Sequence, residues 1–365
     1  MMKIKLGLLL LAGGGIGFAA WLAHAPAPIH ADEVPEKYRD TVAKGLGFLA
    51  KHQAKDGHWE GEDGKHPMAM TGLVGLALVM ERPPNTGRGL PQGRQGKHSE
   101  EIKKAADWLM HQSDAKRDGL LFSGHASETS RYMEGHGLAT LFLAGVCRDE
   151  FSKVRRQQLT EILTRAVKYI GKSQSSQGGW YHTSRLEGHD FDAILPTVIQ
   201  IQALQAANNA GIPIPAEGLR NGQEYLRRVV ARSQDKKSDE RKRLSGTIAA
   251  LVACHNRLGS DVKKGSEQDK WIQYCLTHCP LTRNTADDLD HYYSAQAIFI
   301  GGGSNWKQYR ATFDHIQRAQ DKDGAWPASV GISEGRVYAT ALWCTILQLD
   351  NEHYPAMVEI PREIS

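Results

Sequence analysis

Acidic, histidine and tyrosine side chains gather at the start of four apolar segments of the chain. Carboxylates and imidazoles can act as general acids and bases, and tyrosine hydroxyls can hold a polar group of a ligand. The catalytic candidates are Asp190, Asp192, Asp287, Asp288, Asp290 and His291. The ligand-binding candidates are Tyr132, Glu134, His136, His189, Tyr292, Glu334, Arg336 and Tyr338.

The spacing of these residues suggests that several share one face of a helix. The pairs that lie four apart are Tyr132–His136, Asp287–His291, Asp288–Tyr292 and Glu334–Tyr338. A second interpretation is structural, because acids in a first helical turn are favoured by the helix dipole and can simply cap it. The repetition of the pattern in four places favours a ligand site at one mouth of the fold.

Metal chemistry is less well supported. Cys275 and Cys279 flank His278 at helical spacing, but no fourth ligand is evident, and zinc needs three or four protein ligands. We therefore expect neither a metal nor another cofactor. Buried free thiols are the expected state of the cysteines.

The elements that position these residues form a repeat. Gln53, Gly57 and Trp59 recur at the same spacing as Gln174, Gly178 and Trp180, and again as Gln320, Gly324 and Trp326. A degenerate copy lies near Gln112, and two further units fit the same frame around positions 234 and 278. A unit of this length indicates a repeat architecture.

Each unit combines an amphipathic helix with a helix that is apolar on nearly all sides, which must be covered on all sides. The sequence therefore predicts an all-α fold, an (α/α)6 toroid of six helix pairs in two concentric rings. The turn between the helices uses Asp-Gly chemistry. We expect the tryptophan to pack over this turn and the glutamine to bond the helix end.

The repeated motifs resemble those of a known superfamily. The Gln-x3-Gly-x-Trp segments resemble the repeats of squalene and oxidosqualene cyclases and of protein prenyltransferase β subunits. Residues 132–140, 290–306 and 335–342 are similar to exported bacterial prenyltransferase/squalene-oxidase-repeat proteins of undefined activity. The resemblance covers nearly all of the chain after about residue 38. It implies the toroid fold and an isoprenoid-type ligand.

The motifs of both activities of this superfamily are incomplete. Alkene protonation by such cyclases uses Asp-x-Asp-Asp, whereas Asp190 and Asp192 are followed by Ala193, and Asp287, Asp288 and Asp290 stand in a different order. The zinc site of the prenyltransferases begins with Asp-x-Cys, which does not occur here. If the protein is an enzyme, the resemblance favours a cyclase-like isomerase or lyase over a zinc prenyltransferase.

The amino terminus and the composition bound the remaining alternatives. Residues 1–31 combine a basic start with an apolar run, which predicts a signal peptide or an uncleaved anchor and hence an exported protein. Residues 32–365 are expected to form one domain with a core from about 38 to 350. With 45 Lys and Arg against 41 Asp and Glu, the charge argues against nucleic-acid binding. Membrane association is expected only through the amino-terminal segment.

Three functions are compatible with these features. The first is binding of an elongated apolar ligand in a central cavity, with the polar mouth available for chemistry. The second is a non-catalytic scaffold for a protein or peptide partner. The third, carbohydrate processing, needs paired carboxylates and is disfavoured by the few aromatic residues on the inner helices. The depth of the cavity should separate the first two functions.

Overall fold

Helices are almost the only regular secondary structure in the described chain, which confirms the all-α prediction. The computed structural model describes residues 34–81, 96–114, 118–233, 262–281, 288–328 and 335–357. Within these ranges the only sheet is an antiparallel hairpin of β1 (Ser113–Asp114) and β2 (Leu120–Leu121). Short 3-10 turns connect some of the helices: η1 (Glu62–Gly64), η3 (Ala126–Glu128), η4 (Arg185–Glu187) and η5 (Leu349–Asn351).

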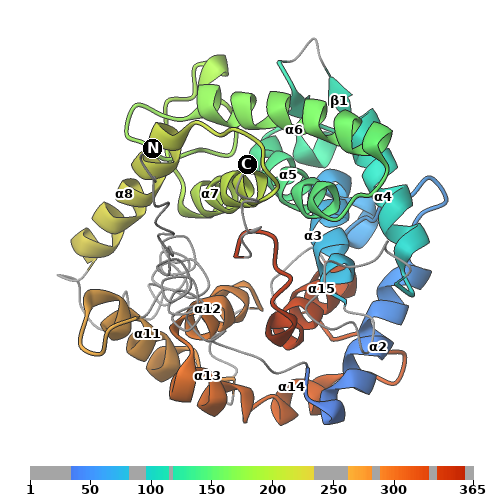
Figure 1. The fold of residues 1–365 in the computed structure, drawn as a ribbon, viewed down its shortest axis with the longest axis vertical. Helices are drawn as coiled ribbons and strands as arrows, with labels where there is room; N and C mark the ends of the chain where they lie inside the picture. The colour runs from blue at the N-terminus through green and yellow to red at the C-terminus, as the bar shows by residue number, and fades with distance from the viewer. Residues whose placement is uncertain are drawn as a thin grey trace, which may run out of the picture.

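The described apolar helices form an inner layer (Figure 1). They are α3 (Pro67–Val79), α5 (Tyr132–Arg148), α7 (Ile194–Asn209), α12 (Asp288–Gly301) and α15 (Gly335–Leu347). In space they contact one another in the order α7, α5, α3, α15, α12. Because almost every side chain on them is covered, their residues can be apolar on all sides.

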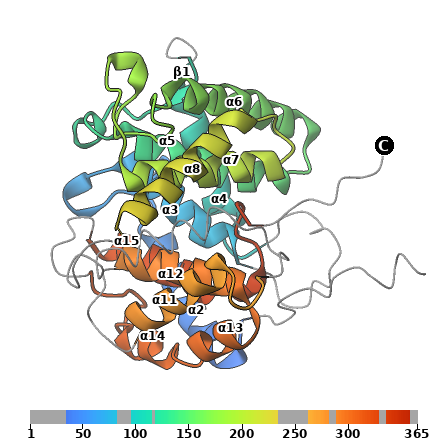
Figure 2. The ribbon, with the colours of Figure 1, turned by 90° about the vertical axis from the view of Figure 1, so that its left-hand side faces the viewer.

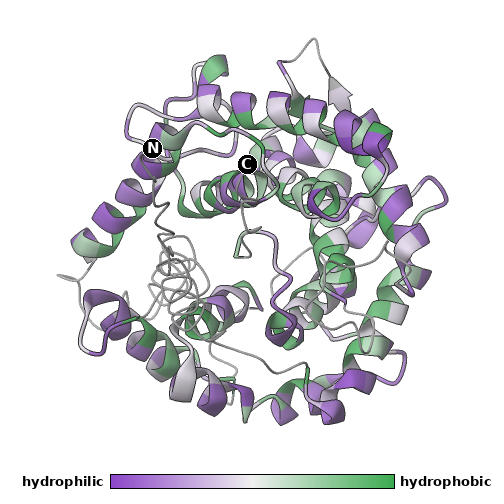
Figure 3. Cartoon of the chain, in the orientation of Figure 1, coloured by the Kyte–Doolittle hydropathy of each residue, from purple (hydrophilic) through white to green (hydrophobic). Residues whose placement is uncertain are grey.

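Amphipathic helices surround this layer. They are α2 (Glu36–Lys51), α4 (Ser99–His111), α6 (Lys153–Ser173), α8 (Ala216–Ser233), α11 (Glu267–His278), α13 (Gly303–Arg310) and α14 (Asp314–Ala319). Figure 3 shows mixed hydropathy on these helices and a largely hydrophobic inner layer. Seen from the side, α8 crosses in front of α7, which it contacts (Figure 2). The expected inner partner of α8 falls within residues 234–261, outside the described residues.

The repeated tryptophans hold the turn between an outer and an inner helix. Their indole Nε1 donates to the carbonyl near the end of the preceding outer helix: Trp59 to Leu49 at 2.7 Å, Trp180 to Ile170 at 2.8 Å and Trp326 to Ile316 at 2.7 Å. Their backbone N–H donates to a threonine hydroxyl on the following inner helix, namely Thr71, Thr197 and Thr340. The predicted structural role of these tryptophans is therefore confirmed.

The repeated glutamines do not bond the helix end, so that detail of the prediction is wrong. The Nε2 of Gln174 donates to the carbonyl of Gly178 within its own turn, at 2.8 Å. It also donates to the carbonyl of Gly218 in the next outer helix, at 2.7 Å. Gln53 and Gln320 make the same pair of bonds. Each glutamine thus joins one repeat to the next, while the tryptophan satisfies the helix end.

The glycine of each turn allows the next outer helix to approach closely. Gly324 has a φ of 95°, and a Cβ atom placed on it would lie 2.4 Å from the carbonyl oxygen of Lys44 in α2. Only glycine combines this conformation with so close an approach of another backbone.

The last repeat packs against the first. Gln320 donates to the carbonyl of Thr41 in α2 at 2.9 Å, and the hydroxyl of Tyr38 donates to Asp314 in α14 at 2.7 Å. The inner helix α15 contacts both the outer helix α2 and the inner helix α3. The two ends of the repeat array are therefore joined by both layers.

The segment after α15 turns back between the inner helices (Figure 1). Residues 354–357 of this segment are buried, and the Tyr354 side chain is 1% exposed. Asn351 Nδ2 donates to the carbonyl of Met80 at the end of α3, and Asn209 Nδ2 donates to the carbonyl of Pro355. The segment therefore occupies the space between the carboxyl ends of the inner helices.

The expected signal peptide or anchor, residues 1–31, lies outside the described residues. Among the helices that the structure describes, none is both long and apolar enough to cross a membrane.

Candidate functional site

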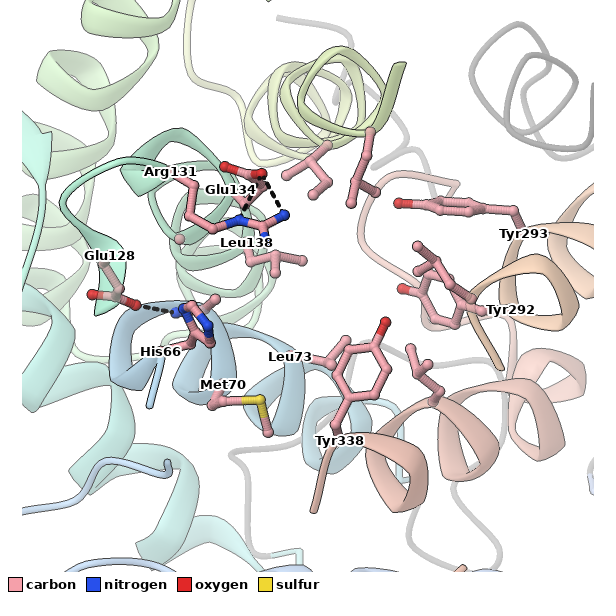
Figure 4. A pocket seen from close by; sticks show the side chains of 16 residues that line it. His66, Met70, Leu73, Glu128, Arg131, Glu134, Leu138, Tyr292, Tyr293 and Tyr338 are labelled. Atoms are coloured by element: carbon pink, nitrogen blue, oxygen red, sulfur yellow. Dashed lines mark hydrogen bonds and ion pairs between the residues drawn. The ribbon is translucent and has the colours of Figure 1, made fainter. Parts of the chain in front are cut away.

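A cavity lies between the amino-terminal halves of the inner helices (Figure 4). Its volume is about 100 Å³. One water needs about 10–15 Å³ of such space, so the cavity has room for several waters or for an apolar group of similar size. Its walls are formed by His66, Ala69, Met70, Leu73, Glu128, Arg131, Glu134, Gly135, Leu138, Leu195, Ile199, Leu289, Tyr292, Tyr293, Tyr338 and Leu342.

Each inner helix contributes one stripe of residues at helical spacing. The first stripe begins at His66, the left-handed residue before α3, and continues along that helix at residues 69, 70 and 73. Positions three and four apart lie on one helix face. The same spacing occurs at 131, 134, 135 and 138, at 195 and 199, at 289, 292 and 293, and at 338 and 342. The cavity is therefore built by five parallel stripes, most of them apolar.

A polar cluster lies on one side of the cavity. Glu134 is in the first turn of α5, and its side chain is 8% exposed. Its Oε1 accepts a hydrogen bond from His182 Nδ1 at 2.6 Å and from the guanidinium of Arg131 at 3.2 Å. Arg131 is 42% exposed and lies at the rim of the cavity (Figure 4). The cluster therefore places a cation and an anion at the mouth, with donors that a polar ligand group can share.

Glu128, the second acid of the lining, has a structural function. Its Oε1 accepts from the backbone N–H groups of Met68 and Ala69 at 2.8 and 3.2 Å, and its Oε2 accepts from Ser123 Oγ at 2.5 Å. These bonds satisfy free N–H groups in the first turn of α3. Burial raises the pKa of Glu128, although the hydrogen bonds oppose this change.

Tyrosines form the opposite side of the cavity. Figure 4 shows Tyr292, Tyr293 and Tyr338 across from Arg131, Glu134 and His66. Tyr292 is 2% exposed, and its hydroxyl lies 2.8 Å from that of Tyr354. Burial raises the pKa of Tyr292 to about 12, so its hydroxyl stays protonated near neutral pH. The tyrosines offer aromatic surface to an apolar chain and hydroxyl groups near it.

Three of the predicted site residues, Glu134, Tyr292 and Tyr338, line this cavity. Tyr132 and His136 do not, although they lie in the same helix as Glu134. The Tyr132 hydroxyl accepts from the backbone N–H of Ser184, and His136 lies against the carbonyl of Ala166 in α6 at 3.3 Å. His136 therefore points between helices and does not line the cavity, contrary to its prediction as a ligand-binding residue.

The predicted residues before α7 and at the start of α15 hold turns. Asp190 accepts from the backbone N–H of Ser176 at 2.7 Å, and Asp192 accepts from that of Gly179 at 3.0 Å. His189 Nδ1 lies 2.7 Å from Thr183 Oγ1. Arg336 pairs with Asp321 and Asp323 at 2.9 and 2.8 Å, outside the cavity. These four residues therefore have a structural function in turns, but none of them caps α7, whose N-cap Ala193 makes no side-chain bond.

The predicted residues of α12 point in different directions. Asp288 and His291 are buried, and the His291 ring packs 5.6 Å from the ring of Trp343 in α15. Asp290 is partly buried and does not line the cavity. Asp287 and Glu334 lie outside the described residues.

Sequence reasoning missed most of the lining, including Met70, Leu73, Arg131, Leu138 and Tyr293. A usable signal was the repeat itself. Because the tryptophan turn contacts Thr71, Thr197 and Thr340, those threonines mark the outward face of their helices. Residues on the other side of each helix then face the interior.

Thiol chemistry and metal binding receive no structural support in the described part of the chain. Cys147, Cys275 and Cys344 are buried free thiols, and burial raises the pKa of each. Within the described ranges, no group of three His, Cys, Asp or Glu residues could hold a metal ion.

No protein-family model matches the chain, and no curated protein matches it. The resemblance to squalene cyclases and prenyltransferase β subunits therefore remains an expectation from the repeat motifs.

Proposed function

We propose that the chain closes into an (α/α)6 toroid that binds an amphiphile, an apolar isoprenoid-type chain with a small polar head, in this cavity. The observation that carries the proposal is the lining: apolar stripes and tyrosines inside, with an Arg131–Glu134 pair at the rim. A concave, mostly apolar pocket with a few polar groups is the usual form of a small-molecule site.

The toroid is supported by the pairing of the described helices. Each described inner helix follows at least one outer helix along the chain, and the seam between Gln320 and Thr41 joins its last repeat to its first. One inner helix is needed between α7 and α12 to complete six pairs. Residues 234–261, which contain the apolar run predicted there, are long enough to supply it.

The size of the cavity limits the apolar part of the ligand. The stripe on α3 runs from residue 66 to residue 73, and at 1.5 Å per residue it spans about 10 Å. Burial of apolar surface contributes roughly 25 cal/mol per Å². We therefore infer that a short isoprenoid chain enters with its apolar end first and derives most of its affinity from Leu73, Leu138 and Ile199.

The head of the ligand is then expected to stay at the rim. Arg131 is half exposed and presents guanidinium donors beside the Glu134 carboxylate. A hydroxyl or another small oxygen-bearing group can bind there without being buried. Binding is favoured over catalysis, because none of the predicted catalytic residues that the structure describes lines the cavity.

Two measurements test this function. Lipid extraction of the purified protein followed by mass spectrometry should recover a bound amphiphile, and farnesol should bind in a tryptophan fluorescence titration. Ala69→Trp, which fills the cavity from α3, should abolish binding. The matched variant Ala311→Trp, on an exposed turn, should bind like the parent. Equal binding by both variants would place the ligand elsewhere.

A peptide-binding scaffold is the second candidate. Leu186 and Phe191 are 54% and 59% exposed on the loop that also carries His182, the partner of Glu134. Exposed apolar side chains of this size often mark interaction sites. Loss of a partner in Leu186→Ser and Phe191→Ser, with farnesol binding intact, would support this function instead.

A further inference from the structure

A polar layer lies one helical turn below the lining residues of α7 and α12. Below Ile199 on α7 lies Gln202, and below Tyr292 on α12 lies Gln296. Gln202 Nε2 donates to Gln296 Oε1 at 2.8 Å, across the space between the two helices. Both side chains are almost fully buried.

Tyr354 completes this layer from the carboxyl-terminal segment. Its hydroxyl donates to Gln202 Oε1 at 2.9 Å and lies 2.8 Å from the hydroxyl of Tyr292. Because Tyr292 also lines the cavity, its side chain touches both the cavity and the segment that fills the far end.

The position of this segment is fixed by the inner helices around it. Gln348 Nε2 donates to the carbonyl of Ala77 in α3 at 3.0 Å. On α5, a Cβ atom at Gly145 would come within 2.7 Å of the Pro355 ring. Asn209 in α7 binds the carbonyl of Pro355 at 3.0 Å. The segment is therefore seated by specific contacts with three helices besides Tyr292, as a built part of the interior.

We propose that Tyr354 sets the depth of the ligand cavity and so determines the longest apolar chain that the protein accepts. This inference rests on the proposed function. A chain that reaches Tyr292 meets a layer in which Gln202 hydrogen-bonds both Gln296 and Tyr354. To pass further it would have to separate these groups and leave buried donors and acceptors unpaired, which is unfavourable. Truncating Tyr354 extends the cavity by about one helical turn, or 5.4 Å.

The test measures chain-length preference with geraniol, farnesol and geranylgeraniol. The reference is the alcohol that the parent binds most tightly. In Tyr354→Ala, the affinity for geranylgeraniol divided by the affinity for this reference alcohol should rise at least tenfold. Tyr354→Phe keeps the ring and should keep the parent's order. Tyr309→Ala, which removes a buried tyrosine from the outer helix α13, should also keep it. An unchanged order in Tyr354→Ala would overturn the inference.

A measurement on the parent protein guards against a variant that fails to fold. A farnesol analogue with a diazirine at the apolar end should label the peptide that contains Tyr354 or Tyr292 on irradiation, as located by mass spectrometry. Labelling confined to the rim peptide with Arg131 would overturn the inference while leaving the proposed function intact. If the parent binds none of the three alcohols, the proposed function itself fails, and the inference fails with it.

Discussion

The Nδ1 atom of His136 accepts a hydrogen bond from the backbone N–H of Leu121 at 3.0 Å. In the complete repeats, a threonine on the inner helix accepts the corresponding bond from the tryptophan N–H, as Thr71 does from Trp59 at 3.0 Å. The second repeat lacks this tryptophan and has the β1–β2 hairpin in its place. His136 therefore takes over the function of the threonine, which explains why a histidine is buried there.

Because a histidine stands where the other repeats have a threonine, we expect the stability of the protein to depend on pH. Burial lowers the pKa of His136 to about 4 from its ordinary 6.5. Between pH 6.5 and 4, His136 is protonated in the unfolded chain but stays neutral in the folded protein. The free energy of unfolding therefore falls as the pH falls through this range. At 1.36 kcal/mol per pKa unit, this one site can cost about 3 kcal/mol.

The comparison of His136→Thr with the parent isolates that effect. Urea unfolding at several pH values should give a flatter stability curve for His136→Thr between pH 4 and 6.5. His111→Thr, on the exposed end of α4, should retain the parent's slope. A His136→Thr curve parallel to that of the parent would show that His136 does not supply the dependence.

Truncation of a turn tryptophan should affect stability without changing ligand preference. Trp326 is 1% exposed and is bonded at both its indole and its backbone nitrogen. Trp326→Ala should lower the free energy of unfolding by about 3–5 kcal/mol. Trp343→Ala, at a partly buried position, should cost less. If Trp326→Ala changed the order of binding among prenyl alcohols, the tryptophan would have to reach the ligand.

Two glycines with similar backbone conformations allow the cost of backbone strain to be measured separately from the cost of a close contact with another backbone. Gly324 and Gly188 have φ values of 95° and 87°, but only Gly324 has another backbone against it. Gly188→Ala should cost about 1 kcal/mol for the left-handed conformation alone. Gly324→Ala should cost about 2 kcal/mol more, because α2 must move away. Equal midpoints in urea would mean that the last turn and α2 do not pack tightly in solution.

The polar rim should matter for ligands with a head group. Arg131→Met keeps an unbranched side chain but removes the guanidinium donors. Loss of one hydrogen bond of about 1 kcal/mol should weaken farnesol binding roughly fivefold. The hydrocarbon farnesene lacks the hydroxyl and should bind Arg131→Met as it binds the parent. An equal loss for both ligands would indicate that Arg131 acts through packing.

The sequence predicted the repeats well because their contacts are local. Gln174, Gly178 and Trp180 lie within one turn, so their spacing alone indicates a helix–turn–helix unit. The direction of the glutamine bond was not predictable, since its second acceptor, the carbonyl of Gly218, lies 44 residues away.

The face of each inner helix that lines the cavity was harder to predict. A helix that is apolar on all sides has no polar face from which its rotation can be inferred. The spacing of Tyr132 and His136 correctly placed them on one face, but that face contacts η4 and α6 rather than the cavity. Glu134 faces the cavity because α5 turns by about 100° per residue, and this orientation is set by contacts far away in the sequence.

The seam between Gln320 and Thr41 also constrains the order of folding. These two residues are 279 positions apart, so the bond between them can form only when almost the entire chain has been synthesised. Contacts of such high sequence separation slow folding, because a long loop must be closed before they form. Until then, the surface of α2 that the last repeat covers stays exposed. Chains that end before that repeat are therefore expected to persist as open, aggregation-prone arcs.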